Sequence, residues 1–184
     1  MNNATRNTIL IAAAIVVGLV LGFQFPMLGL LLIIPVIAFV AIVFLRNKGG
    51  ADADESLAAE ARKFTASEGK AAIYVMRKGF VAGQQGMNVT IDGGQTTQFR
   101  TGRFAKAEVE PGEHTITAQM ASQTKGTAAT HTVSLAAGEC VLLDVKLSVG
   151  ALQGSLSYEE TRNTAEARGK LAGLKLVLWS EPEA

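Results

Sequence analysis

The hydrophobic pattern divides the chain into two parts. Residues 8–45 form an apolar run without Asp, Glu, Lys, Arg or His, whereas apolar and polar positions alternate over much of the later sequence. An uncharged run of this kind predicts membrane insertion, because about 20 helical residues cross a hydrocarbon core of about 30 Å. The run is about twice that length, which is too long for one straight crossing.

Gln24, Phe25 and Pro26 lie near the middle of the run. Proline removes a helical hydrogen bond and biases the preceding residue toward extended geometry. We therefore expect a two-helix transmembrane hairpin in residues 1–46, with spans at about 8–23 and 27–45 and a turn at these three residues.

Small residues occur at every fourth position of the first predicted span, at Ala14, Gly18 and Gly22. Residues at this spacing share one helix face and allow close approach of another helix. The face is expected to pack against the second span, or alternatively against another copy or another membrane protein.

Basic residues flank the hairpin on one side only. Arg6 precedes it, Arg46 and Lys48 follow it, and the predicted turn has no base. Basic flanks remain cytoplasmic, so we expect both termini and the later domain on the cytoplasmic side of a bacterial inner membrane. The alternative topology has a single span and a periplasmic domain.

Residues 47–68 are predicted to be a linker with a short amphipathic helix. Gly49 and Gly50 provide a swivel, and a helical apolar pattern follows over about 54–65. The apolar positions of that helix are Leu57, Ala58, Ala61 and Phe64.

Residues 69–184 have the alternation and regular turn signals of a β-sandwich or small barrel. Asp92-Gly93-Gly94 predicts a hairpin turn, and Glu110-Pro111-Gly112-Glu113 predicts a type II turn. The expected strands are residues 71–76, 87–91, 95–100, 104–109, 114–120, 130–135, 140–147, 152–158 and 174–179, with a helix over 164–173 that is broken at Gly169 and Gly173.

Charge and composition exclude several functions. All 16 acids and 15 of the 17 bases follow Arg46, so the domain is nearly neutral and is not expected to bind nucleic acid. Cys140 is the only cysteine, which excludes an intrachain disulfide. His114, His131 and Cys140 do not have metal-ligand spacing, and Glu108 and Glu110 are expected to be solvated. We therefore predict no catalytic, metal or cofactor site, no small-molecule substrate and no enzyme activity.

One group of bases is a candidate for surface contact. Arg77, Lys78, Arg100, Arg103 and Lys106 would form a basic patch if the second hairpin folds back on the first strand. Such a patch would contact anionic head groups or a partner beside the anchor, whereas the alternative is an ordinary mixed surface.

Three segments resemble a known family. They are Gly69-Lys70-Ala71-Ala72-Ile73-Tyr74-Val75 with Arg77, then Val89-Thr90-Ile91-Asp92-Gly93, then Pro111-Gly112-Glu113-His114-Thr115. Over residues 68–178 this resembles the bacterial domain of unknown function twenty-eight forty-six. The resemblance implies an immunoglobulin-like or transthyretin-like sandwich, often on envelope lipoproteins, with no established activity. This chain departs from the family in having a predicted hairpin in place of a lipid anchor.

The sequence therefore predicts a mainly β protein on a membrane hairpin. Its expected function is that of a non-enzymatic interaction or scaffold module, either a homo-oligomer or an accessory subunit of a larger membrane assembly. The alternative is an envelope-side domain that senses a ligand or binds glycan or peptide.

Overall fold

The computed structural model describes residues 49–79, 85–121, 128–149 and 154–180, together with scattered positions between Gln24 and Leu45. The chain divides into two compact units, Met1–Leu45 and Arg46–Ala184. The described positions of the first unit are all helical and exposed. Among the described residues, no helix is both long enough and apolar enough to cross a membrane.

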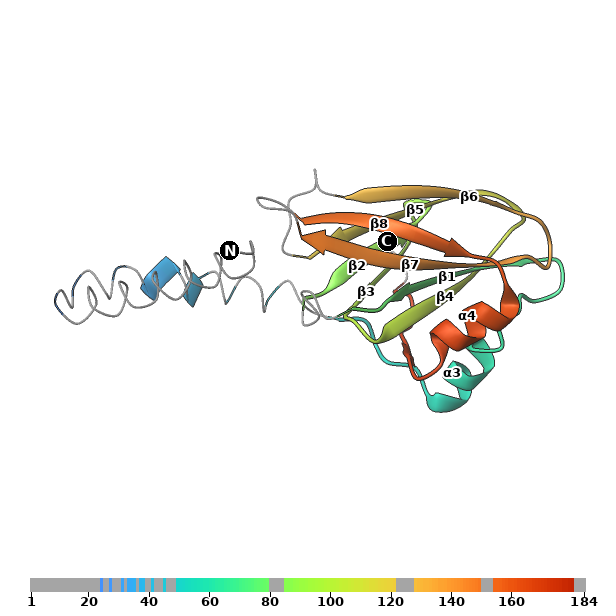
Figure 1. The fold of residues 1–184 in the computed structure, drawn as a ribbon, viewed down its shortest axis with the longest axis horizontal. Coiled ribbons are helices and arrows are strands. Elements are labelled where there is room, and N and C mark those ends of the chain that lie inside the picture. Colours follow the sequence, from blue (N-terminus) through green and yellow to red (C-terminus); the bar gives the residue numbers. More distant parts are fainter. Residues whose placement is uncertain are drawn as a thin grey trace, which may run out of the picture. The chain divides into compact units, whose positions relative to one another are not determined.

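The second unit is mainly β and consists of two sheets (Figure 1). One sheet has five strands in the order β8-β7-β1-β4-β9, and the other has four strands in the order β3-β2-β5-β6. Two helices, α3 and α4, accompany the five-stranded sheet. The elements are α3 Glu55–Ala61, β1 Ala71–Arg77, β2 Met87–Ile91, β3 Gln95–Phe99, β4 Arg103–Val109, β5 Gly112–Met120, β6 Ala129–Leu135, β7 Cys140–Val149, β8 Gly154–Thr161, α4 Thr164–Leu171 and β9 Lys175–Leu176.

The strand β1 is buried on both faces. Its residues Ala71, Ile73 and Val75 enter the core shared by the two sheets, whereas Tyr74 and Met76 enter a second core beneath α3 and α4. Alternate residues of a strand point to opposite faces, so a strand covered on both sides needs the continuous apolar sequence found here. The shared core between the sheets confirms the mainly β prediction and is consistent with a β-sandwich.

The predicted turn after β2 is confirmed. Asp92 and Gly93 have φ values of 51° and 71°, and the Gly94 N–H donates to the carbonyl oxygen of Ile91 at 3.0 Å. Two positive φ values suit the right-handed twist of an antiparallel pair, and Asp-Gly is a favoured sequence for them. The strands β2 and β3 accordingly form an antiparallel pair, in which Ile91 lies opposite Gln95 next to the turn.

Two predicted local features are wrong. The segment at Glu110–Glu113 is not a type II turn, because Gly112 has φ 150° and is already the first residue of β5. At this point the chain passes from β4 in the five-stranded sheet to β5 in the four-stranded sheet. The helix α4 continues through Gly169, and only Gly173, with φ 76°, follows its end. Glycine is tolerated inside α4 because Ala167 and Leu171 are buried beneath the helix and hold it in place.

The helix α3 is shorter than the predicted 54–65, and its buried face differs from the expected one. Ala58 and Ala61 are buried, and so is Phe64 after the helix, but Leu57 is 51% exposed. The last predicted strand is also shorter: β9 covers only Lys175–Leu176, and Val177 and Ser180 form isolated bridges.

The linker before α3 is fixed between the two sheets. The Gly50 N–H donates to the carbonyl oxygen of Gln98 in β3 at 2.6 Å, and the Ala53 N–H donates to that of Leu176 in β9 at 2.9 Å. The Leu178 N–H donates to the carbonyl oxygen of Ala51 at 3.0 Å. We call these three backbone contacts the linker clamp.

The clamp requires glycine at position 50. A Cβ atom there would lie 2.5 Å from Val177 Cγ1, 2.9 Å from Thr97 Oγ1 and 3.2 Å from the Gln98 carbonyl oxygen. Two of these neighbours belong to buried side chains, so they cannot move without disturbing the core.

We expect Gly50→Ala to destabilise the second unit by about 1–3 kcal/mol, the usual consequence of overpacking. Urea unfolding followed by the fluorescence of Trp179 measures the change. Gly94→Ala is the matched control, because a Cβ atom at Gly94 meets no heavy atom within 4 Å. Equal stabilities of the two variants would contradict the close packing at Gly50.

Candidate functional site

Three of the five bases predicted to form a surface patch serve contacts within the fold. Arg77 is only 2% exposed, and its Nη1 donates to the Gln85 carbonyl oxygen at 2.7 Å. Lys106 lies on the face of the five-stranded sheet opposite to that of Arg77, and its Nζ is 2.9 Å from Glu108 Oε1. The Nζ of Lys78 donates to the Lys170 carbonyl oxygen at 3.0 Å. The five bases are therefore not brought together in one patch.

The other two bases, Arg100 and Arg103, lie beside the linker clamp. They follow β3 and begin β4, so the connection between the two sheets places both next to the linker. The two arginines border a hollow of about 300 Å³, which we call the linker hollow. It is lined by Gly49, Gly50, Asp52, Gln98, Phe99, Arg100 and Arg103.

The linker hollow carries excess positive charge. The Nε and Nη2 of Arg103 donate to the two carboxylate oxygens of Asp52 at 2.9 and 3.3 Å, and this hydrogen bonding lowers the pKa of Asp52. Lys175 is the register partner of Arg103 in β9, and its charge also lowers the Asp52 pKa. Within the described chain, neither Arg100 nor Lys175 has an ion-pair partner. Arg103 and Lys175 thus both act on the Asp52 carboxylate, and Arg100 lines the same hollow.

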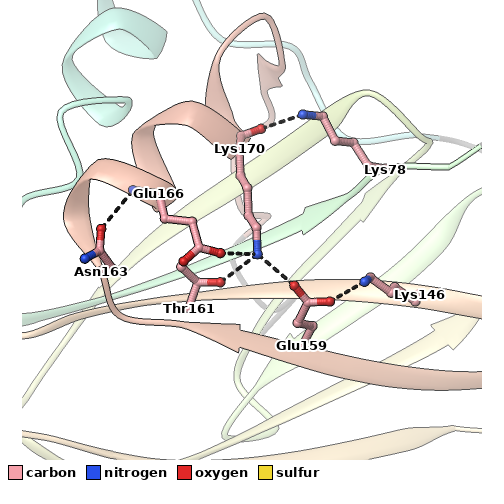
Figure 2. Close-up of polar contacts among 7 residues, drawn as sticks. All are labelled: Lys78, Lys146, Glu159, Thr161, Asn163, Glu166 and Lys170. Carbon is pink, nitrogen blue, oxygen red and sulfur yellow. Dashed lines mark hydrogen bonds and ion pairs between the residues drawn. The ribbon is translucent and has the colours of Figure 1, made fainter.

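A second polar cluster joins α4 to the edge of the five-stranded sheet (Figure 2). Glu159 of β8 pairs with Lys146 of β7, and its other oxygen is 2.8 Å from Lys170 Nζ. Lys170 also lies 2.9 Å from Glu166 and 2.9 Å from Thr161 Oγ1. We call this set the lysine–carboxylate cluster.

The charges of the lysine–carboxylate cluster are mutually stabilised. Hydrogen bonds from Lys146 and then Lys170 lower the pKa of Glu159 to about 2, and Glu159 raises the pKa of both lysines. A carboxylate with so low a pKa is a weak base, and a lysine that remains protonated is not a nucleophile. The cluster is therefore suited to attaching α4 to the sheet rather than to proton transfer.

Asp144 lies next to this cluster and differs from it. It is the register partner of Glu159, is 7% exposed, and its Oδ1 has no hydrogen-bond partner. Burial raises the pKa of Asp144; the charges of Lys146 and Lys170 and the Lys78 backbone N–H oppose that rise. The residue lines a hollow of about 390 Å³ with Arg77, Lys78, Gly79, Lys146, Leu147 and Ser148.

The sequence prediction did not identify Asp144 as a candidate. The available signal was a single acidic residue within the apolar strand Val141-Leu142-Leu143-Asp144-Val145. A carboxyl group in such a strand is either paired or neutral, since a buried charge without a partner is strongly unfavourable. Applied to the sequence, this rule would have identified Asp144 as a candidate functional residue.

The histidines are held by neighbouring polar groups. His114 Nδ1 is 2.6 Å from Asp92 Oδ2, and its Nε2 is 2.7 Å from the Glu110 carbonyl oxygen. His131 stacks on Tyr158 with ring centroids 5.2 Å apart. Within the described ranges, no three His, Cys, Asp or Glu side chains are grouped so that they could hold a metal ion. Both histidines therefore have structural contacts.

Cys140, at the start of β7, is half-buried, and burial raises the pKa of its thiol. A raised pKa reduces the thiolate fraction, so the residue lacks the character of a reactive cysteine. The carboxylates considered from the sequence are ion-paired, Glu108 with Lys106 and Glu110 with Lys70.

The remaining predicted positions belong to the apolar run. Ala14, Gly18, Gly22, Phe25 and Pro26 lie outside the described residues, and Gln24 is helical. The helix-packing face and the hairpin turn therefore stay predictions.

No family model matches the chain, and no curated protein matches it. The resemblance of residues 68–178 to a domain of unknown function therefore also stays a prediction.

We expect Asp144→Asn to stabilise the fold by about 1 kcal/mol, because it replaces a poorly solvated acid with an uncharged group of similar shape. The gain should be larger at pH 8 than at pH 5, since a raised folded-state pKa means that ionisation at higher pH destabilises only the wild type. Thermal unfolding at both pH values tests this. If Asp144→Asn were less stable than the wild type by the same amount at both pH values, the raised pKa of Asp144 would be contradicted.

His114 should make stability depend on pH in the opposite sense to a paired carboxylate. Burial disfavours its charged form, but hydrogen bonds to Asp92 and to the Glu110 carbonyl oxygen outweigh burial and raise its pKa. The stabilisation is therefore complete below the unfolded pKa of about 6.5 and is lost as pH rises through the raised folded pKa. We expect His114→Gln to remove on the order of 1 kcal/mol at pH 6 and less at pH 9.

The measurement for His114 is the free energy of unfolding of the wild type and of His114→Gln at the two pH values. An NMR titration of the ring protons measures the pKa directly. A ring that titrates below the unfolded value would contradict the predicted sign.

Proposed function

We propose that the chain is a membrane-tethered, non-enzymatic interaction module. The observation that supports this most directly is the run of residues 8–45, which has no ionisable side chain and precedes a folded unit with its own core. An apolar run of that length in water would expose far more hydrophobic surface than a soluble protein normally does.

In this proposal, residues 8–23 and 27–45 are the two spans of a hairpin that turns at Gln24, Phe25 and Pro26. Ala14, Gly18 and Gly22 form the face on which helices pack, within the hairpin or between copies. The basic residues Arg6, Arg46 and Lys48 support a cytoplasmic location for both termini and the β unit at the inner membrane.

The β unit supplies the surface for partners. β8 is eight residues long, forms an edge of the five-stranded sheet, and pairs with no strand other than β7 in the described structure. An edge strand can add a strand from another chain, which supports self-association or docking to another membrane subunit. An immunoglobulin-like or transthyretin-like sandwich, as the resemblance implies, would present such edges without any catalytic motif.

The charged side chains also support a non-enzymatic role. The lysine–carboxylate cluster fixes Glu159, Lys146 and Lys170 in their charged forms. Groups held in this way are not poised for acid–base work near neutral pH.

A second candidate function is a ligand-binding domain on the envelope side. The buried Asp144 favours it, because its unpaired Oδ1 lies at a hollow large enough for a small polar molecule. The two functions place the β unit on opposite sides of the membrane, so its location distinguishes them.

Topology labelling tests the proposed function. In a Cys140→Ser background, single cysteines are introduced as Asn3→Cys, Phe25→Cys and Ala184→Cys, and intact spheroplasts are treated with a membrane-impermeant maleimide. We expect labelling at position 25 only, and labelling of all three sites after lysis.

Two results would contradict the proposed arrangement. Labelling of position 184 in intact spheroplasts would favour the envelope-side domain. Release of the full chain from membranes by carbonate at high pH would exclude a membrane-integral anchor altogether.

A further inference from the structure

We propose that the linker hollow, together with Lys175, binds the head group of an anionic phospholipid. The inference rests on the proposed function, because it takes the apolar run as membrane-inserted. It differs from the patch expected from the sequence, since Arg77, Lys78 and Lys106 take no part and Lys175 is added.

Charge supports an anionic ligand. Arg103 is already hydrogen-bonded to Asp52 through two nitrogens, whereas the Arg100 guanidinium and the Lys175 ammonium beside it form no ion pair with a described residue. Glu55 is bound by Arg62 at 2.5 Å, and the charge of Lys175 also lowers the pKa of Glu55. A planar guanidinium can donate two parallel hydrogen bonds to a phosphate group, and a nearby ammonium adds charge.

The shape of the hollow also suits a head group. About 300 Å³ is enough for a phosphate and part of its polar substituent, and the lining is mainly polar backbone and side-chain groups rather than apolar ones. Each carboxylate oxygen of Asp52 accepts one hydrogen bond from Arg103 and can accept a second from a hydroxyl group next to the phosphate. The hollow is therefore better suited to a phosphoglycerol head group than to an acyl chain.

The position of the hollow in the sequence points to a lipid rather than a soluble anion. Gly49 lines it, and its N–H donates to Gln98 Oε1 at 2.8 Å, so the linker is attached at this point. Only residues 46–48 separate Gly49 from the apolar run, and four extended steps reach at most about 14 Å. If residue 45 ends a membrane span, this short connection keeps the hollow within reach of the head groups.

The bases between the apolar run and the linker hollow also favour contact with anionic lipids. Arg46 and Lys48 flank the predicted span. Anionic lipids of the cytoplasmic leaflet attract such juxtamembrane bases, and the attraction decays within about 8 Å at physiological ionic strength. Arg100 and Lys175 would extend this basic segment onto the folded unit and fix its orientation at the membrane.

Native mass spectrometry of the full chain, purified in detergent, tests the proposal. The probes are phosphatidylglycerol and phosphatidylcholine with identical acyl chains, added in equal amounts. We expect the wild type to retain phosphatidylglycerol preferentially. Each base removed should reduce that preference about fivefold, so Arg100→Gln with Lys175→Gln should reduce it about twenty-five-fold.

The matched control removes two charges elsewhere on the unit, by Lys63→Gln with Arg168→Gln. Lys63 follows α3, Arg168 lies in α4, and neither residue lines the linker hollow. We expect the control to retain the wild-type preference. Arg100→Lys keeps the charge but loses the guanidinium fork, and should give an intermediate preference even if a double variant folds poorly.

Several results would overturn the inference. These are an equal preference in the wild type and the Arg100/Lys175 variant, an equal loss in the control, or displacement of the lipid by free glycerol phosphate at the same concentration. A chain that purifies from the aqueous fraction without detergent would overturn the membrane tether as well. A membrane-integral chain without lipid preference would overturn only the head-group site.

Discussion

The linker clamp is the constraint on which the rest of the structure depends. It passes between Gln98 of the four-stranded sheet and Leu176 of the five-stranded sheet, so one short segment joins both layers at the end of the domain where the chain enters. Gly50 permits this because a side chain there would collide with Val177 and Thr97. The clamp also decides which surface lies next to residues 46–48. Without it, the linker would be a free swivel, and the proposal that one surface of the β unit faces the membrane would lose its structural basis.

The polar groups of the domain fall into two sets with different roles. Those of the lysine–carboxylate cluster satisfy one another and attach α4 to β7 and β8, which covers the outer face of β1 (Figure 2). Exposed ion pairs contribute little individually, so their role here is to position a helix over an apolar core. The bases around the linker hollow exceed their acidic partners. An excess of this kind adds nothing to stability by itself, and it is more readily explained by a ligand outside the chain.

The sequence predicted much of the fold, because local signals and tertiary structure agree there. Strand β2, its Asp92-Gly93 turn and β3 follow from alternation and turn chemistry alone. Prediction failed where distant contacts decide the outcome: Gly169 stays helical because the core beneath α4 holds it, and Leu57 is exposed although it fits the apolar period of α3. The candidate site was predicted less well. The five bases of the predicted patch lie on different faces and strands, because alternate residues of a strand point to opposite sides. Lys175 lies beside Arg103 because β9 pairs with β4 in parallel, and the distance between the two residues in the sequence gives no sign of this pairing.

Amide hydrogen exchange on the full chain measures the linker clamp most directly. The amides of Gly50, Ala53 and Leu178 are hydrogen-bonded to the carbonyl oxygens of Gln98, Leu176 and Ala51. They should therefore exchange far more slowly than amides of an unstructured peptide, with protection approaching that of β1. Exchange of these three amides at unstructured rates, while β1 remains protected, would show that the linker is free. That result would contradict the proposal that this surface faces the membrane.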